Sequence, residues 1–162
     1  MDAICTAALA QFRLQEQAYL AVVHGLSDET LNWRPGPETN SIAVLVAHAW
    51  GSVQDWTARA AGTTIERDRA AEFRAVLSGA ECKALIQRAM ERVISFVEAI
   101  DPATYGDDRV DREGDHCTVA YCLIHAVEHT QEHLGHAELT RQFGLFRRAR
   151  PRPRRSTSTT QT

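Results

Sequence analysis

Helical periodicity over four long segments is the feature that most limits what this chain can fold into. Apolar residues recur every three or four positions in each segment, which is the spacing of one face of an α-helix. The segments run from about Ala3 to His24, from Ser41 to Ala60, from Ala80 to Ile100 and from Thr118 to Phe143. None shows the alternation of apolar and polar residues that is typical of a half-buried strand. Four helices of about 20 residues each predict an all-α four-helix bundle.

Residues that stop helices follow each of these segments. Gly25 and Gly62 come after the first two, and Gly144 comes after the fourth, where a helix often ends in a left-handed glycine. Pro102 comes after the third, and proline disfavours the helical conformation in the residue before it. The sequence therefore predicts that the fourth helix ends at Phe143.

The connection between the second and third predicted helices, residues 63–79, is the longest in the chain. It contains I-E-R-D-R-A-A-E-F, which is compatible with one helical turn, and its length would allow it to cross the bundle. Residues 33–40, W-R-P-G-P-E-T-N, hold two prolines and a glycine and predict a loop. Residues 105–117 are polar and predict another loop.

The 162 residues suit one domain, which we place at 1–145. The remainder, 146–162, includes R-R-A-R-P-R-P-R-R and has no apolar period, so it predicts a disordered basic tail. The formal charge of the whole chain is −3, which gives no reason to expect a specific nucleic-acid partner.

Cellular location is judged from apolar runs, the N-terminus and cysteine spacing. No apolar run approaches the roughly 20 residues of a membrane span, and no basic region precedes an apolar stretch as in a signal peptide. The cysteines, Cys5, Cys82, Cys117 and Cys122, form no C-x-x-C motif, so we expect reduced thiols. A cytoplasmic protein with no membrane partner is the resulting prediction.

Four of the seven histidines lie in the last predicted helix. At about 100° per residue, His129 and His133 fall on its apolar face, with His133 near the centre. His125 and His136 fall on the flank of that face. A solvated face is therefore a poor explanation for His133.

Histidines four positions apart lie one above the other on a helix, and two such imidazoles can bind one metal ion. The competing interpretation is a pair of core histidines that bond to side chains or water. His48 lies at the edge of the core-facing stripe of the second helix, and a third imidazole from a facing helix would complete a site with open positions. The sequence favours a metal site at His48, His129 and His133. Zinc, nickel and iron all suit three imidazoles.

Two stretches carry a family resemblance. W-R-P-G-P-E-T-N-S-I-A-V-L-V-A-H-A-W-G, which contains His48, is similar to the opening half of DinB-like proteins. H-A-V-E-H-T-Q-E-H-L-G-H-A-E-L-T-R-Q is similar to their last helix. The resemblance covers residues 5–144. It implies a four-helix bundle that holds one divalent metal through a histidine of the second helix and two residues four apart on the last, here His48, His129 and His133.

The H-x-G-H-A ending at 133–137 resembles the mycothiol-dependent branch of that family, in which the position of His129 can be glutamate. The resemblance implies an enzyme that acts on a small molecule with a low-molecular-weight thiol such as mycothiol, as a transferase or isomerase. Metal-dependent hydrolysis and a non-catalytic metal- or ligand-binding stress-response protein are the alternatives. A protein whose histidines merely pack is another.

Further residues can serve around such a centre. His125 and His136 are candidates for proton carriers or for partners of the ligands, and Arg141 is a candidate for holding a carboxylate. The tryptophans Trp33, Trp50 and Trp56 can line a pocket near His48, or they belong to the core or to a subunit interface. Trp50 is expected to point away from His48, which makes it the better candidate for the interface of a homodimer.

Overall fold

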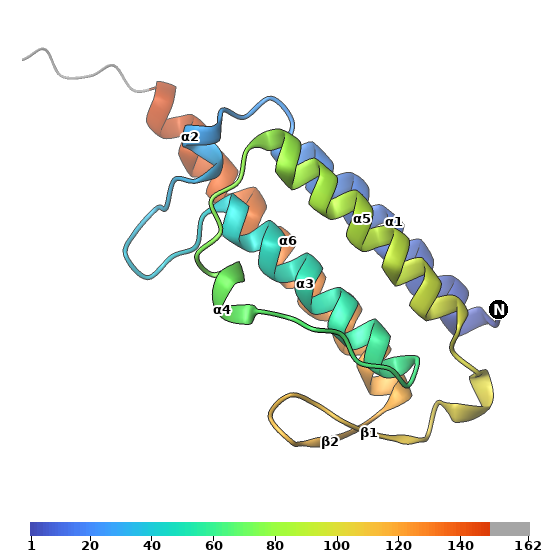
Figure 1. The fold of residues 1–162 in the computed structure, drawn as a ribbon. Helices are drawn as coiled ribbons and strands as arrows, with labels where there is room; N and C mark the ends of the chain where they lie inside the picture. Colours follow the sequence, from blue (N-terminus) through green and yellow to red (C-terminus); the bar gives the residue numbers. More distant parts are fainter. Residues whose placement is uncertain (150–162) are drawn as a thin grey trace, which may run out of the picture.

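Four long helices form the body of the protein, whose computed structural model describes residues 1–149 (Figure 1). They are α1 (Ala3–Val23), α3 (Ile42–Ala60), α5 (Gly79–Glu98) and α6 (Val119–Ala149). The shorter elements are α2 (Asp28–Leu31), α4 (Arg69–Glu72), the 3-10 turn η1 (Pro102–Thr104), β1 (Asp108–Val110) and β2 (His116–Thr118). The four-helix prediction is confirmed. Of the tail predicted as disordered, residues 146–149 are instead helical, and residues 150–162 lie outside the described residues.

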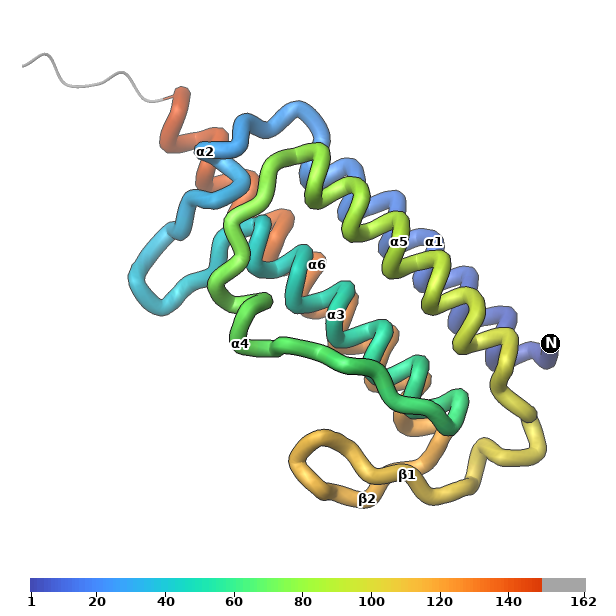
Figure 2. The backbone as a smooth tube through the Cα atoms, in the orientation of Figure 1, coloured from blue at the N-terminus to red at the C-terminus, as the bar shows by residue number. Residues whose placement is uncertain are grey.

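The four helices pack in a ring in the order α1, α5, α3, α6. Helices α3 and α5 run in the same direction, as do α1 and α6 (Figure 1). The connection between α3 and α5 must therefore return along the length of the bundle. The backbone trace shows it doing so, with α4 partway along (Figure 2), and α4 packs against α3. This path brings a loop segment against the outer side of α3.

Side chains at the helix starts explain where the elements begin. Ser41 accepts a hydrogen bond from the backbone N–H of Val44, and Ser78 forms a capping box with Glu81, which satisfies backbone donors that have no partner within the helix. The glycines at the ends of α1 and α3, Gly25 and Gly62, have φ values of 73° and 76°. Both glycines act as the sequence predicted, because the left-handed conformation costs glycine little.

The predicted end of the last helix at Phe143 is wrong, because α6 continues through Gly144 to Ala149. A Cβ at Gly144 would lie 3.0 Å from Cγ2 of Thr30 and 3.5 Å from the Trp33 ring. Gly144 therefore serves close packing against α2 rather than a left-handed turn. Arg148 also donates hydrogen bonds to Ser27 and Thr30, so tertiary contacts hold the extra turns.

Residues 105–117, which the sequence predicted as a loop, include most of two short strands that no pattern indicated. Strands β1 and β2 form a small antiparallel hairpin, with Arg109 opposite Cys117. Each strand has three residues, which is too short for a periodic pattern to reveal. Arg109 donates a hydrogen bond from Nε to the carbonyl of Arg59, at 3.0 Å. This bond ties the hairpin to the end of α3.

Trp50 lies in the core and not at a surface. Its side chain is fully buried and meets Tyr19 edge-on, with ring centroids 5.8 Å apart. The interpretation of Trp50 as an interface residue is therefore wrong, because the first half of α3 is buried on nearly all sides. The homodimer itself stays a prediction. Among residues 1–149, no helix combines the length and apolar character needed to cross a membrane.

Candidate metal centre

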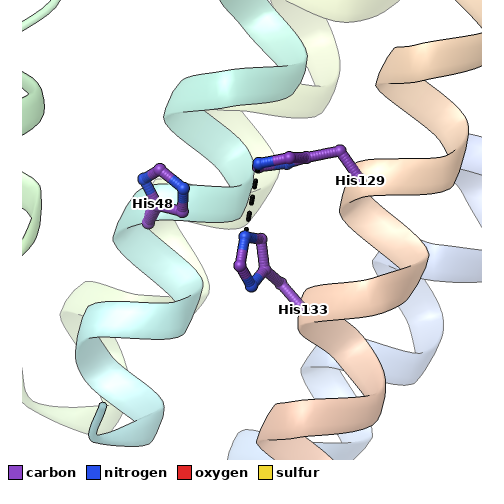
Figure 3. A group of neighbouring side chains, drawn as sticks. All are labelled: His48, His129 and His133. Atoms are coloured by element: carbon purple, nitrogen blue, oxygen red, sulfur yellow. Dashed lines mark hydrogen bonds between the residues drawn. The ribbon is translucent and has the colours of Figure 1, made fainter. Parts of the chain in front are cut away.

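Three imidazoles converge between α3 and α6. His48 comes from α3, and His129 and His133 come from successive turns of α6 (Figure 3). The ring centroid of His48 lies 5.2 Å from that of His129 and 4.9 Å from that of His133. One nitrogen from each ring can be chosen so that all three lie within 4.8 Å of one another. The structure thus brings together the three residues that the sequence selected.

The spacing of the nitrogens fits a metal ion. Nε2 of His129 lies 3.3 Å from Nε2 of His133. Two nitrogens bound at about 2.0–2.1 Å to one tetrahedral ion lie about 3.3 Å apart. The Nδ1 atoms of both rings are buried and have no hydrogen-bond partner among the described residues. Such groups are costly in an interior, and an ion bound through the two Nε2 atoms would not relieve that cost.

The two histidines of α6 are neutral near pH 7. Burial lowers the pKa of His129 to about 3, and the nearby His133 and His48 add to the effect. Burial also lowers the pKa of His133 to about 4, again with a contribution from His48. Only the neutral imidazole offers a lone pair to a metal. The electrostatics of the pair therefore keep it in the form that binds.

The sequence placed His133 near the centre of the apolar face of α6, but in the structure its side chain is only half-buried. The fully buried face of α6 includes Cys122, Ala126, Thr130 and Leu134. His129 and His133 are half-buried on the side that faces α3. The site consequently opens to the side of the bundle rather than to its central axis.

Glu72 holds the third histidine in place. Its Oε2 lies 3.0 Å from Nδ1 of His48. Burial would raise the pKa of Glu72, but hydrogen bonds from His48 and Arg67 outweigh it, and the pKa is lowered. The carboxylate is thus ionised and accepts the Nδ1–H of His48, which leaves Nε2 free for a metal. This carboxylate–histidine pair is a common support for metal-binding histidines.

Arg67 completes this support. Its guanidinium donates to both oxygens of Glu72, from Nε at 2.6 Å and from Nη2 at 2.8 Å. Nη2 also lies 3.3 Å from Nδ1 of His48. An ionised Glu72 cannot donate a proton, so Nδ1 carries the hydrogen and the Arg67 contact is not a hydrogen bond to a lone pair. Arg67 acts on the histidine through Glu72.

Gly51 makes this arrangement possible. A Cβ at Gly51 would overlap Oε1 of Glu72 and would lie 2.9 Å from its carboxyl carbon. The absence of a side chain on α3 at this point lets the carboxylate approach the helix. Sequence reasoning missed Glu72, Arg67 and Gly51, since the loop motif I-E-R-D-R-A-A-E-F has no spacing that links it to His48.

A cavity of about 280 Å³ lies beside His48 and His129. One wall is aromatic: His125 stacks on Tyr121 with centroids 5.6 Å apart and lies 4.4 Å from the Trp56 ring. His125, a candidate from the sequence, therefore faces the cavity. Small molecules that enter it would reach the imidazoles from the open side.

The opposite wall is charged. The buried carboxylate of Asp55 contacts Arg112 at 2.8 Å, Arg59 at 3.5 Å and Arg67 at 3.8 Å. With Glu72, this network holds three guanidinium groups against two carboxylates. Arg112 is the most exposed of the three, with 32% of its side-chain surface accessible. The charged residues that line the cavity balance one another: Arg67, Arg69 and Arg112 against Asp55, Asp111 and Glu113.

The other two candidates do not face this cavity. His136 is exposed and lines a separate hollow with Leu45 and Phe143, although its ring lies 5.7 Å from His133. Nη1 of Arg141 donates to the carbonyls of Val22 and His24 at 2.5 and 3.0 Å. Arg141 thus caps the end of α1 and is not brought to the metal centre.

The chain is therefore a helical bundle with a cluster of three histidines that could hold a metal ion. Its sequence matches the DinB superfamily over residues 11–137, and the chain belongs to that superfamily. No curated protein matches it.

Solved structures share the fold. A conserved protein from Enterococcus faecalis is 12% identical, with a TM-score of 0.75 over 90% of this chain and 99% of that one. A DinB-like protein from Bacillus cereus is 14% identical, with a TM-score of 0.68 over 85% of this chain and 91% of that one. A DinB-like protein from Bacillus subtilis is 18% identical, with a TM-score of 0.66 over 85% and 92%. At these identities the likeness concerns the fold alone.

Proposed function

We propose that this protein is a metal-dependent enzyme that acts on a small molecule with a low-molecular-weight thiol, such as mycothiol, by transfer or isomerisation. His48, His129 and His133 would hold one divalent ion, for which zinc, nickel and iron are suitable. The observation that carries the proposal is the convergence of three imidazole nitrogens within 4.8 Å at the edge of a cavity. Three protein ligands leave coordination positions open, as reactive sites require.

The chemistry would divide between the ion and the chain. A divalent ion supplies Lewis acidity, which lowers the pKa of a thiol or a water in contact with it. Glu72 keeps the Nε2 lone pair of His48 directed at the ion. His125 faces the cavity 5.5 Å from His129, by ring centroids, and can carry a proton between cavity and solvent. The rings of Trp56 and Tyr121 offer an apolar surface that limits water.

The charge of the cavity narrows the substrate class. Three guanidinium groups and three carboxylates line the cavity, so their charges balance, and the preference for a ligand with an anionic group would come from the bound ion. Arg112 is the accessible member and can contact a carboxylate or phosphate. We propose a thiol or an acceptor that bears such a group.

Hydrolysis is the alternative reaction, with water in the place of the thiol. It is favoured by the polar wall of the cavity around Asp55 and Arg112. A non-catalytic metal-binding or ligand-binding protein is the second alternative. This alternative is favoured because Glu72 is bonded to Nδ1 of His48. Its carboxylate therefore does not face the open side of the imidazoles, where a general base would act.

Metal content tests the first step. The protein would be purified without a histidine tag and analysed by elemental mass spectrometry beside His48→Ala, His133→Ala and the exposed control His24→Ala. We expect about one ion per chain in wild type and control and a loss in the two site variants. A wild-type protein that takes up no ion even after reconstitution would overturn the proposal.

Cobalt substitution separates the reactions. N-acetylcysteine would be titrated into the cobalt-loaded protein while its absorption spectrum is recorded. A new sulfur-to-cobalt charge-transfer band supports the thiol reaction. A spectrum that does not change when the thiol is added, but changes with pH near neutrality, supports water at the open coordination position. That outcome would favour hydrolysis.

A further inference from the structure

Two cysteines lie together outside the metal centre. Cys117 belongs to β2 and Cys122 to the first turns of α6, and their sulfur atoms are 3.6 Å apart. Both are free thiols. The remaining cysteines lack such a neighbour among the described residues: Cys5 contacts the hydroxyl of Tyr105 at 3.1 Å, and Cys82 is fully buried. Only this pair is placed for bond formation within residues 1–149.

We propose that Cys117 and Cys122 form a reversible disulfide by exchange with a low-molecular-weight disulfide. A disulfide bond is about 2.05 Å long, so closing the 3.6 Å gap requires about 1.5 Å of approach, which side-chain rotation can supply. The two sulfur atoms are in direct contact. The proposal does not depend on the proposed metal chemistry.

The two thiols differ in a way that sets the order of reaction. Cys117 is half-buried, and an incoming disulfide can reach it. Cys122 has no exposed surface, and burial raises its pKa to about 12, with a further contribution from Cys117. Thiolates are the attacking species in exchange. Cys117 is therefore the thiol that attacks first, and Cys122 is the thiol that resolves.

The exchange balances in two steps. The Cys117 thiolate attacks one sulfur of the small disulfide, forms a mixed disulfide and releases the first small thiolate. Cys122 then attacks the Cys117 sulfur, loses its proton to the medium, forms the bond between the two cysteines and releases the second small thiolate. The protein loses two hydrogens, and the small disulfide is reduced to two thiols.

The bond would affect one wall of the cavity. The loop of the hairpin carries Asp111, Arg112 and Glu113 to the cavity lining, and β2 leads directly into α6. A covalent link from β2 to α6 would restrict movement of the hairpin relative to that helix. The position of Arg112 beside the cavity would then depend on the redox state of the cysteine pair.

Oxidised glutathione is the probe for the test. The full chain would be fully reduced, freed of reductant under argon, incubated with the probe and measured by intact mass and peptide mapping. We expect the wild type to lose about 2 Da without a lasting adduct. A peptide pair joined through Cys117 and Cys122 should appear, and a reductant should reverse it. The free thiols, counted after denaturation, should fall from four to two.

Variants assign the roles. Cys122→Ser should stop at one glutathione adduct on Cys117, and Cys117→Ser should leave Cys122 unmodified. Cys5→Ser and Cys82→Ser should behave as wild type. Because serine at the buried Cys122 can destabilise the fold, Cys122→Ala would be run beside it. A folded wild type that keeps four thiols, holds a stable adduct on Cys117, or links a different pair would overturn the proposal.

Discussion

Glu72 accepts a hydrogen bond from Nδ1 of His48 across 3.0 Å, although 24 residues separate them in the chain. The bond exists because the connection after α3 returns along that helix and places α4 beside the histidine. It fixes which nitrogen of His48 faces His129 and His133. Part of the candidate centre is therefore built by the connection and not by the bundle.

Replacing Glu72 tests that support. Glu72→Gln keeps a carbonyl acceptor but removes the charge, and we expect metal affinity to fall about 10- to 100-fold, as is typical when a partner of a metal-bound histidine is changed. Competition with a chelator measures the affinity. Glu66→Gln, an exposed change in the same connection, should leave it unaltered. Equal affinities for all three proteins would show that Glu72 does not support the site.

Gly51→Ala should act through the same carboxylate. Its Cβ would displace Glu72, so metal affinity should fall, as expected for Glu72→Gln. The double variant should bind metal no more weakly than the single variant with the lower affinity. Gly135→Ala in α6 is the matched control, because a Cβ there meets nothing within 4 Å. The control should be neutral or stabilise by up to about 1 kcal/mol. Additive losses from Gly51 and Glu72 would contradict the shared mechanism.

The stability of the metal-free protein should depend on His129 and His133 below neutral pH. Their folded pKa values are lowered to about 3 and about 4, whereas an unfolded histidine titrates near about 6.5. The unfolded state therefore binds more protons than the folded state as the pH falls. The contribution of the two histidines to the free energy of unfolding is fully present above pH ~6.5 and is lost as the pH falls toward their folded pKa values. Each group contributes a slope of at most about 1.4 kcal/mol per pH unit.

Urea unfolding measures this slope. Between pH ~6.5 and ~5.5 carboxylates contribute little, so the decline should come chiefly from the histidines. A variant with His129→Gln and His133→Gln should show a flatter profile, and the exposed control His24→Gln should follow wild type. A wild-type profile that stays level across this window would refute the burial of two neutral imidazoles.

Arg112→Gln should weaken the binding of an anionic ligand and lower the stability of the fold only slightly. Asp55 would lose its 2.8 Å partner but keep Arg59 and Arg67 within 4 Å, so we expect a stability loss of about 1 kcal/mol. Binding of a carboxylate-bearing thiol to the metal-loaded protein, followed by calorimetry, should weaken severalfold. Arg88→Gln, an exposed change on α5, serves as the control. Unchanged ligand affinity in Arg112→Gln would remove the basis for an anionic substrate.

The sequence by itself determined the four long helices and selected the three histidines of the cluster. Ser41, Ser78 and the glycines after α1 and α3 act within one turn of their own position, so their effect can be predicted from local spacing. The placement of His129 and His133 is equally local, because residues four apart share one side of any helix. His48 followed from its position on a facing helix of the bundle.

Only the tertiary structure decided what surrounds them. Nothing in the spacing of the chain links Glu72 to His48 or Arg112 to Asp55, because each pair meets across a connection whose path depends on packing. The same reason explains why α6 continues past Gly144 and why Trp50 lies in the core. Periodicity determines which face a residue occupies, whereas long-range packing determines what that face touches.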